Sequence, residues 1–598
     1  MAEKVLRRDE IKEEYKWKLE DMFPSDEAWL KALEDAEQYI ERGAAFAGKL
    51  GSSAKTLLDF MHYDDDATVA LHSLSGYISA RGDQDTSDAK YQDYKMRMRS
   101  FFVRYSSAMA YVSPELISID DETMERFYKE EPDLELYRLA LTRTRRERDH
   151  TLSLPEEAVM AAVSPLRSAA STTYSLFANA DIKFPPAVDS EGNLHELTNS
   201  TYRVYLTDAD RELRKSAFEN IYHTYEQFKN TVASLYDAEV KSRIFNAKTR
   251  KYPSILEAAL QRNEVPVSVY KNLIDTVHKN MDYMHKYIKL RKKLMGVDEL
   301  HMYDLHTTLV PDADVKITFE EAKDTVLEAL HVLGDDYIAM LKEGFDNRWI
   351  DVYENVGKRS GAYSSGQSPH PYVLLNHKDD LDSMFTLAHE MGHALHSYLS
   401  LKNQPIAYAG YVIFVAEVAS TCNEALLMQH LLQKTEDKMQ RAYLINYFLE
   451  QFRTTLYRQT MFAEYEMLSG EMAERGESLT AECLSKLYHK LNVEYYGDGA
   501  TSDREIAFEW ERIPHFYYNY YVFQYATGFS AAMALSERIL KEGEPAVKDY
   551  LKFLSSGSST DPISLLKIAG VDMNSPEPID NALKLFGELI DELDALLS

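Results

Sequence analysis

Two histidines and a glutamate stand near the middle of the chain with a spacing suited to metal chemistry. His389-Glu390-Met391-Gly392-His393 reads His-Glu-x-x-His, and residues four apart share one face of a helix. Both imidazoles can therefore reach one metal ion, while Glu390, about 100° further round the helix than His389, lies near a metal-bound water. A zinc ion that ionises water and a carboxylate that accepts its proton are what hydrolysis of a peptide bond requires.

The residues around this motif predict the helix that would position it. Apolar side chains recur at helical spacing between Met384 and Leu399, and Asp382 is placed to cap the N-terminus. His396, seven residues after His389, lies near the same face and is an alternative ligand or a residue that supports one. The motif alone is also compatible with histidines that bind no metal, so its context is needed.

A second predicted helix, residues 411–430, follows after a short loop and carries two carboxylates. Glu417 and Glu424 are seven residues apart, share one face with Thr421 and have apolar neighbours. An acidic pair on an apolar helix is costly to bury unless it is paired or bound to metal. We therefore predict Glu417 as the third zinc ligand and Glu424 as the hydrogen-bond partner of a ligating histidine. The alternative is a pair of glutamates that faces solvent.

This arrangement resembles the thimet oligopeptidase family of zinc peptidases, and within it the bacterial oligoendopeptidase F branch. The resemblance extends to Trp-Lys-Leu-Glu-Asp-Met-Phe at residues 17–23, Tyr-Asp-Leu at 303–305, Gly-Ala-Tyr-Ser-Ser-Gly at 361–366 and His-Phe-Tyr-Tyr-Asn-Tyr-Tyr at 515–521. These motifs occur in the expected order over nearly the whole chain. Gln-Ser-Pro-His-Pro at 367–371 departs from the pattern, which affects the expected substrate preference and not the chemistry.

The resemblance implies further site residues. In this family a histidine and tyrosines on a mobile loop close over the zinc and donate hydrogen bonds to the scissile carbonyl. Here these are His515, Tyr518 and Tyr521, although the tyrosines can also simply line the wall of the site. A strand beside the zinc helix is expected to pair with the extended substrate; the alternative is that the strands only pack beneath the helix. The residues expected to contact substrate are Gly361, Ala362, Tyr363, Tyr517 and Tyr520.

The remaining sequence predicts a mostly α fold. Long amphipathic patterns cover residues 26–42, 54–80, 88–112, 208–246 and 257–297, and Thr318 opens another helix with a capping box. A β-hairpin is expected within 182–197, and short strands within 349–353, 361–366 and 372–375, directly before the zinc helix. We expect an N-terminal helical region over residues 1–200 and a catalytic region over 201–598. By resemblance, two helical halves flank a deep channel.

Composition limits the partners. The 598 residues carry a net charge of −30, which argues against nucleic acid and anionic membranes as partners. The chain has two cysteines, no signal-peptide pattern at its start and no apolar run of membrane-spanning length, which together predict a cytoplasmic protein.

The predicted function is a zinc endopeptidase, with one Zn²⁺ per chain, that cleaves internal bonds of short unstructured peptides. A zinc carboxypeptidase or dipeptidyl-carboxypeptidase on a similar scaffold is an alternative, as is a peptide-binding relative without catalytic activity. The intact Glu390 argues against the last of these. Whether the protein is a monomer or a homo-oligomer stays open.

Overall fold

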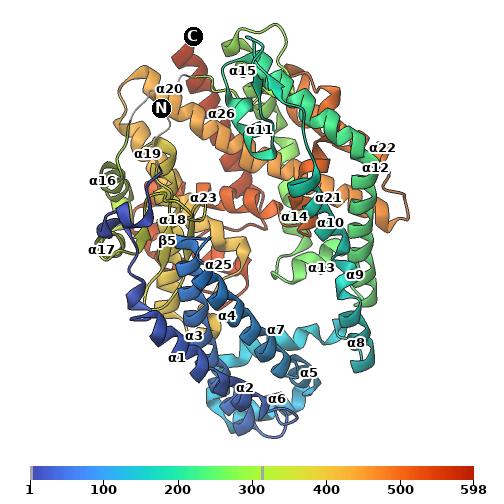
Figure 1. Cartoon of the computed structure of the whole chain (residues 1–598), viewed down its shortest axis with the longest axis vertical. Coiled ribbons are helices and arrows are strands. Elements are labelled where there is room, and N and C mark those ends of the chain that lie inside the picture. The colour runs from blue at the N-terminus through green and yellow to red at the C-terminus, as the bar shows by residue number, and fades with distance from the viewer. Residues whose placement is uncertain (1–4, 311–315) are drawn as a thin grey trace. The chain divides into compact units, whose positions relative to one another are not determined.

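The computed structural model describes residues 5–310 and 316–598, most of which are helical (Figure 1). The chain forms two compact units, each assembled from three segments. The first unit comprises Met1–Asp149, Val315–Leu427 and Leu535–Gly570, and the second comprises His150–Asp314, Met428–Ala534 and Val571–Ser598. Within the described residues, no helix combines the length and hydrophobicity that crossing a bilayer requires. The predicted mostly α fold is confirmed, and the functional division at residue 200 remains a proposal.

The first unit contains the N-terminal helices and the helix of the His-Glu-x-x-His motif. Its helices are α1 (Asp26–Asp35), α2 (Glu37–Ala44), α3 (Ala54–Gln84), α4 (Ala89–Ala108), α5 (Val112–Ser118), α6 (Asp121–Glu130), α7 (Arg138–Arg146), α16 (Phe319–Ala329), α17 (Asp335–Asp346), α18 (Leu381–Asn403), α24 (Glu544–Leu554) and α25 (Pro562–Ile568). The pattern over residues 26–42 thus forms two helices, since α1 ends at Asp35.

The second unit is also helical, and the boundary between the units falls within α19 (Ile413–Lys434) and α23 (Phe523–Glu542). Its other helices are α8 (Leu154–Ala162), α9 (Ser164–Arg167), α10 (Ala169–Leu176), α11 (Asn199–Thr207), α12 (Arg211–Thr249), α13 (Ile255–Gln261), α14 (Val267–Lys279), α15 (Met281–Met295), α20 (Lys438–Gln451), α21 (Arg458–Glu474), α22 (Ala481–Tyr496) and α26 (Glu577–Leu597). The predicted hairpin is present as β1 (Ala187–Val188) paired antiparallel with β2 (Leu194–His195).

A three-stranded sheet lies beside α18, as predicted. Its order is β3 (Ile350–Asp351), β5 (Tyr372–Leu374), β4 (Tyr363–Ser365), with β3 parallel and β4 antiparallel to β5. The sheet meets α18 closely, because a Cβ on Gly366, directly after β4, would lie 2.7 Å from the Cβ of Ser397. β4 therefore forms one edge of the sheet next to the motif helix.

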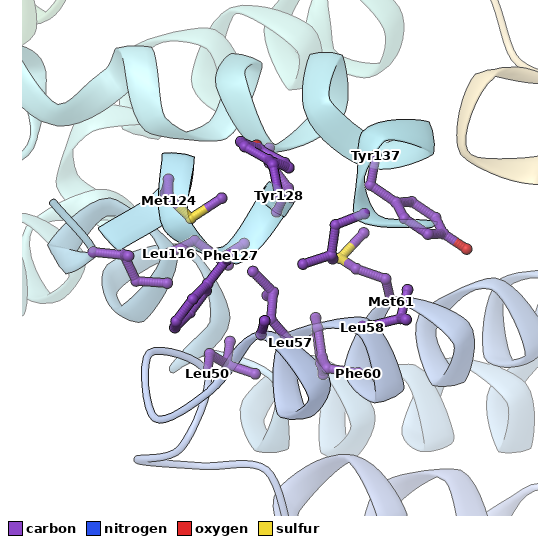
Figure 2. Packing of buried hydrophobic residues seen from close by; sticks show 14 of the residues in the cluster. Leu50, Leu57, Leu58, Phe60, Met61, Leu116, Met124, Phe127, Tyr128 and Tyr137 are labelled. Carbon is purple, nitrogen blue, oxygen red and sulfur yellow. The ribbon is translucent and has the colours of Figure 1, made fainter. Parts of the chain in front are cut away.

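Buried side chains of the N-terminal helices hold the first unit together. Figure 2 shows one cluster, in which Leu57 and Phe60 of α3 pack against Phe127 of α6. A second cluster joins Trp17 to β5, where the rings of Trp17 and Tyr372 meet edge to face with centroids 6.3 Å apart. Trp17, the first residue of the motif at 17–23, thus packs against the sheet.

The motif helix begins two residues earlier than expected. Asp380 has extended backbone angles and its side chain accepts a hydrogen bond from the Ser383 N–H at 2.8 Å, so Asp380 is the N-cap of α18. The prediction of Asp382 was wrong, because Asp382 already lies in the first helical turn. The capping box at Thr318 of α16 is confirmed, with Glu321 bonding back to the Thr318 N–H.

Candidate metal centre

Helix α18 presents the two histidines of the motif side by side. The ring centroids of His389 and His393 are 4.8 Å apart and the rings are nearly perpendicular. Both side chains are partly buried on the face of α18 that meets α19. The four-residue spacing therefore does bring both imidazoles to one place.

A carboxylate from α19 completes a group of three donors. The Oε2 atom of Glu417 lies 3.3 Å from Nε2 of His389 and 3.4 Å from Nε2 of His393. One ligand atom from each residue lies within 4.8 Å of the other two, and no other such group occurs among residues 5–310 and 316–598. Two imidazole nitrogens and one carboxylate oxygen form one of the donor sets of catalytic zinc sites, which keep a fourth position open. The residues present fit a zinc ion.

The close approach of α19 to α18 depends on a glycine that the sequence analysis did not single out. A Cβ on Gly392 would lie 2.6 Å from Cα of Ser420 and 2.8 Å from the carbonyl oxygen of Ala419. Only a residue without a side chain fits there, and it brings Glu417 within reach of the histidines. A glycine inside a helical pattern costs about 1 kcal/mol relative to alanine, so its presence was a signal of close packing.

Hydrogen bonds between α19 and α18 orient the three donor residues. Oε1 of Glu424 lies 2.5 Å from Nδ1 of His389. This carboxylate accepts the Nδ1 proton, so the Nε2 lone pair of His389 points toward Glu417 and is free to bind a metal. One residue before Glu424, the Asn423 side chain donates to the Ala388 carbonyl at 3.1 Å and accepts from the Tyr337 hydroxyl at 3.0 Å.

Glu390 lies beside the donor group and is almost inaccessible to solvent. Its side chain is buried, and its Oε2 atom has no hydrogen-bond partner among the described residues. Burial raises the pKa of Glu390, and the electrostatic influence of the neighbouring His389 and His393 side chains opposes that shift. A carboxylate with a free oxygen and a raised pKa is equipped to accept and return a proton.

His396 does not join the donor group. Its ring stacks on Tyr411 with centroids 3.8 Å apart and planes 3° from parallel, and it is 1% exposed. Burial lowers the pKa of His396 to about 3, so the ring is neutral. Because the Tyr411 stack is next to the start of α19, His396 helps to anchor that helix and is not one of the three grouped donors.

The strand residues expected to contact substrate lie at the sheet edge. Tyr363 opens β4, and its hydroxyl donates to Asp83 at 3.0 Å, which fixes the ring. Gly361 and Ala362 precede it, and Gly361 has φ of +83°, a conformation in which glycine is preferred. The Asn376 side chain donates to the Gly361 carbonyl at 2.7 Å, which holds the strand entrance in place.

His515, Tyr518 and Tyr521 form an aromatic group in the second unit. The ring centroids of His515 and Tyr518 are 5.4 Å apart, and Tyr521 packs edge to face on Tyr525 at 5.3 Å. Tyr518 is 56% exposed, and burial lowers the pKa of the half-buried His515. The hydroxyl of Tyr518 and the imidazole of His515 are therefore both available as hydrogen-bond donors.

Tyr517 and Tyr520 point into the second unit instead. Tyr517 stacks on Tyr174 with centroids 4.2 Å apart, and Tyr520 is 3% exposed. The Tyr520 N–H donates to the buried carboxylate of Glu466 at 3.1 Å, and Glu466 in turn pairs with Arg243 at 3.3 Å. The structure thus leaves Tyr518 exposed and Tyr521 partly buried beside Tyr525, whereas Tyr517 and Tyr520 pack into the second unit.

Comparison with known proteins gives the context of this site. The model of peptidase family M3 matches residues 204–585, which include all of α18 and α19, and the model described as oligopeptidase F matches residues 115–184. The chain belongs to peptidase family M3. Its membership, with the His389, His393 and Glu417 group, identifies a metallo-oligopeptidase.

Relatives of this M3 peptidase cover it from end to end. Oligopeptidase PepF of Bacillus subtilis is 49% identical over 597 residues, which is all of this chain and 89% of the relative. The crystal structure of a putative peptidase from Chlamydophila abortus superposes with a TM-score of 0.92 at 35% identity, covering 99% of this chain and 100% of the other. Oligoendopeptidase F from Enterococcus faecium gives a TM-score of 0.75 at 36% identity, covering 96% and 99%.

Proposed function

We propose that this M3 peptidase is a zinc-dependent endopeptidase that hydrolyses internal bonds of short, unstructured oligopeptides in the cytoplasm. The observation that carries the proposal is the grouping of His389, His393 and Glu417 within 4.8 Å, beside the buried Glu390, whose Oε2 has no partner among the described residues. We assign the first three residues as ligands of one Zn²⁺ per chain. A substrate channel that admits only flexible peptides belongs to the same proposal, as does a catalytic region over residues 201–598.

A zinc ion bound at this donor set would supply Lewis acidity, which lowers the pKa of water and polarises a carbonyl. Glu424 keeps a proton on Nδ1 of His389, so the Nε2 atom stays unprotonated and available. Gly392 sets the distance between α18 and α19 and with it the position of Glu417. These residues act before substrate arrives, because their geometry is fixed by helix packing.

Glu390 is assigned as the general base and then the general acid. Its free Oε2 accepts a proton from the attacking water, and burial, which favours the neutral carboxyl, stabilises the protonated form. The same carboxyl then returns this proton to the nitrogen of the leaving amine. The side chain is used twice and ends in the state in which it began.

The remaining assignments concern substrate. Edge strand β4 has no strand neighbour on its outer side among the described residues, which supports pairing of an extended peptide with Gly361, Ala362 and Tyr363. His515, Tyr518 and Tyr521 are assigned as donors to the oxygen of the scissile carbonyl, where negative charge develops. Tyr517 and Tyr520 would support that segment from the interior of the second unit. The buried thiol of Cys422, whose pKa burial raises to about 12, has no chemical role.

Metal content and cleavage position test the proposal together. The dialysed protein is expected to retain one zinc per chain, and a fluorogenic peptide acetylated at its N-terminus and amidated at its C-terminus is expected to be cut internally. Glu417→Ala should lose the zinc, whereas His396→Ala should retain it, because His396 stacks on Tyr411 outside the donor group. Exposed Glu343→Gln is the matched control for charge removal in the same unit.

The opposite results are informative. Cleavage that requires a free C-terminus and removes only one or two terminal residues would identify a carboxypeptidase or dipeptidyl-carboxypeptidase. Zinc binding without any hydrolysis would identify a peptide-binding protein. Loss of zinc from His396→Ala with retention in Glu417→Ala would overturn the ligand assignment.

A further inference from the structure

The second unit contains a cavity with a positively charged lining. Its volume is about 300 Å³, at the lower end of the range for small-ligand pockets. The lining residues are Ser164, Arg167, Ser168, Ser171, Glu239, Ser242, Arg243, Asn246, Ile255, Ala258, Arg262 and Asn519. Apart from Ile255 and Ala258, every one of them carries a polar side chain.

Three helical faces build this cavity. Lining residues from each face recur at spacings of three, four and seven: 164, 167, 168 and 171 over α9 and α10; 239, 242, 243 and 246 on α12; and 255, 258 and 262 on and just after α13. Figure 1 shows α9 and α10 alongside α12, and both α10 and α13 contact α12. The cavity is therefore part of the packed helical framework.

Two of the three arginines in the lining have no counter-charge within the part of the chain that the structure describes. Arg243 is neutralised by Glu239 and Glu466, each at 3.3 Å, and donates to the Phe516 carbonyl at 2.6 Å. Among the described residues, neither Arg167 nor Arg262 makes an ion pair or a side-chain hydrogen bond, and the Nε atom of Arg167 is buried without a partner. Two unpaired guanidinium groups beside several hydroxyls, in a chain of net charge −30, form a local site for an anion.

The cavity touches the segment that carries the proposed oxyanion donors. Asn519 lines it and stands between Tyr518 and Tyr520, with φ of +54°. Its buried side-chain oxygen has no hydrogen-bond partner in residues 5–310 and 316–598. Arg243, on the cavity wall, holds the same segment through the Phe516 carbonyl. An anion bound here would lie next to residues 515–521, where the peptide is proposed to be held.

We propose that this cavity binds a carboxylate of the peptide substrate, with Arg167 and Arg262 as its cationic ligands and Ser242 and Asn246 as neutral donors. The proposal rests on the peptidase function given above and extends it to substrate selection. The carboxylate is either the C-terminus of the peptide or the side chain of an acidic residue. Guanidinium groups recognise both through the same paired N–H···O geometry.

Binding to an inactive variant tests this independently of turnover. Zinc-loaded Glu390→Gln protein is titrated with an N-terminally dansylated nonapeptide that has neutral side chains, made as the free acid and as the amide. The acid is expected to bind about 10- to 100-fold tighter, the effect of one or two charge-assisted hydrogen bonds. Adding Arg167→Gln and Arg262→Gln should reduce that ratio to about one. Arg203→Gln, an exposed arginine elsewhere in the unit, is the matched control.

A third peptide separates the two sources of carboxylate. The amidated nonapeptide with one glutamate near its C-terminal end should regain tight binding if the site accepts a side chain, and should bind like the plain amide if it accepts only a terminus. Equal affinities for all three peptides in the Glu390→Gln background would overturn the proposal. So would an acid preference that survives the double arginine substitution. Since binding is measured without hydrolysis, a catalytically silent wild type would refute the peptidase function and leave this result interpretable.

Discussion

The helix pair α18–α19 and the segment over residues 515–525 position polar side chains in different ways. In the pair, His389, His393 and Glu417 follow regular helical geometry, and their relative places are fixed where Gly392 meets Ser420. In the segment, Asn519 and Tyr520 have φ of +54° and +59°, and the direction of each tyrosine depends on that local backbone. Non-glycine residues adopt this conformation at a cost, so surrounding contacts must maintain it.

This difference shows what each region is suited to do. A donor group on two packed helices is preorganised, because neither backbone can shift without losing buried contacts. A segment with two left-handed residues that is held by hydrogen bonds from Arg243 and to Glu466 can change conformation when a few bonds break. We therefore expect substitutions in the helix pair to affect the chemical step or metal affinity directly. In the segment, we expect substitutions of Tyr518 and Tyr521 to affect catalysis and substitution of the buried Tyr520 hydroxyl not to.

The largest effect is expected for Glu390→Gln. The amide has nearly the same shape but cannot accept a proton, so kcat should fall by about 10²- to 10⁴-fold while zinc content stays normal. Stopped assays with a quenched peptide and metal analysis of the same sample measure both quantities. A metal-loaded variant with near-normal kcat would remove Glu390 as the base and leave the helix pair with metal binding alone.

Next in size, Tyr518→Phe or Tyr521→Phe should lower kcat by about 10²- to 10³-fold, the cost of one oxyanion donor. KM should change little, because the bond forms mainly in the transition state. Tyr520→Phe is the internal control, since its hydroxyl lies 3.4 Å from the Glu466 carbonyl in the interior. If Tyr518→Phe and Tyr521→Phe both keep wild-type kcat, these two tyrosines only line the wall of the site and do not act as hydrogen-bond donors in catalysis.

A smaller effect, on zinc affinity, is expected for Glu424, the hydrogen-bond partner of His389. Glu424→Gln replaces the carboxylate that accepts the Nδ1 proton of His389, and zinc affinity should fall by about 10- to 100-fold. Competition with a chelator of known affinity gives this number. An unchanged affinity would show that helix packing alone orients the imidazole.

The smallest effect concerns the stability of the second unit near residues 515–525. Glu511 of the 3-10 helix η12 (Arg504–Arg512) is buried, both of its carboxylate oxygens lack a partner among the described residues, and burial raises its pKa to about 9. The folded protein thus holds a proton that the unfolded chain releases near pH 4.5, so the stabilisation is complete below pH 4.5 and is lost as pH rises through 9. Thermal unfolding should show Tm falling from pH 5 to pH 9, by about 1 to 2 °C per kcal/mol lost, because the shift per kcal/mol decreases as the unfolding unit grows. Glu511→Gln should flatten this slope; an unaltered slope would assign it to other groups.

The helix pair could be predicted from the sequence because its polar and apolar residues recur at helical spacing. His389 and His393 share a face by spacing alone, and Glu417 and Glu424 are seven residues apart on the next amphipathic pattern. The predicted strands were also found, since they are short β-branched or aromatic runs between turn residues. The helix start was misplaced because Asp380 and Asp382 are chemically equivalent caps, and only backbone geometry distinguishes them.

The segment over residues 515–525 could not be resolved in the same way. A period of 3.6 or 2.0 gives no direction to side chains on either side of two left-handed residues, so Tyr518 and Tyr520 are indistinguishable by pattern. Arg167 and Arg262 are nearly a hundred residues apart, and no local feature shows that both lack a carboxylate partner. Their role depends on which helices pack together, which is tertiary information.

The interleaved order of the two units has a consequence for synthesis. Each unit needs a segment from the last part of the chain: Leu535–Gly570 for the first and Val571–Ser598 for the second. When the ribosome has reached residue 500, neither core is complete. Helix α18 still lacks its partner α24, and helices α15 and α20 still lack their partner α26, so their apolar faces stay accessible to water. Nascent chains with long-lived exposed apolar surface depend on chaperones and aggregate readily. Helix α18 is thus made before the segment Leu535–Gly570 that completes its unit, so activity reports the arrival of the C-terminal segments.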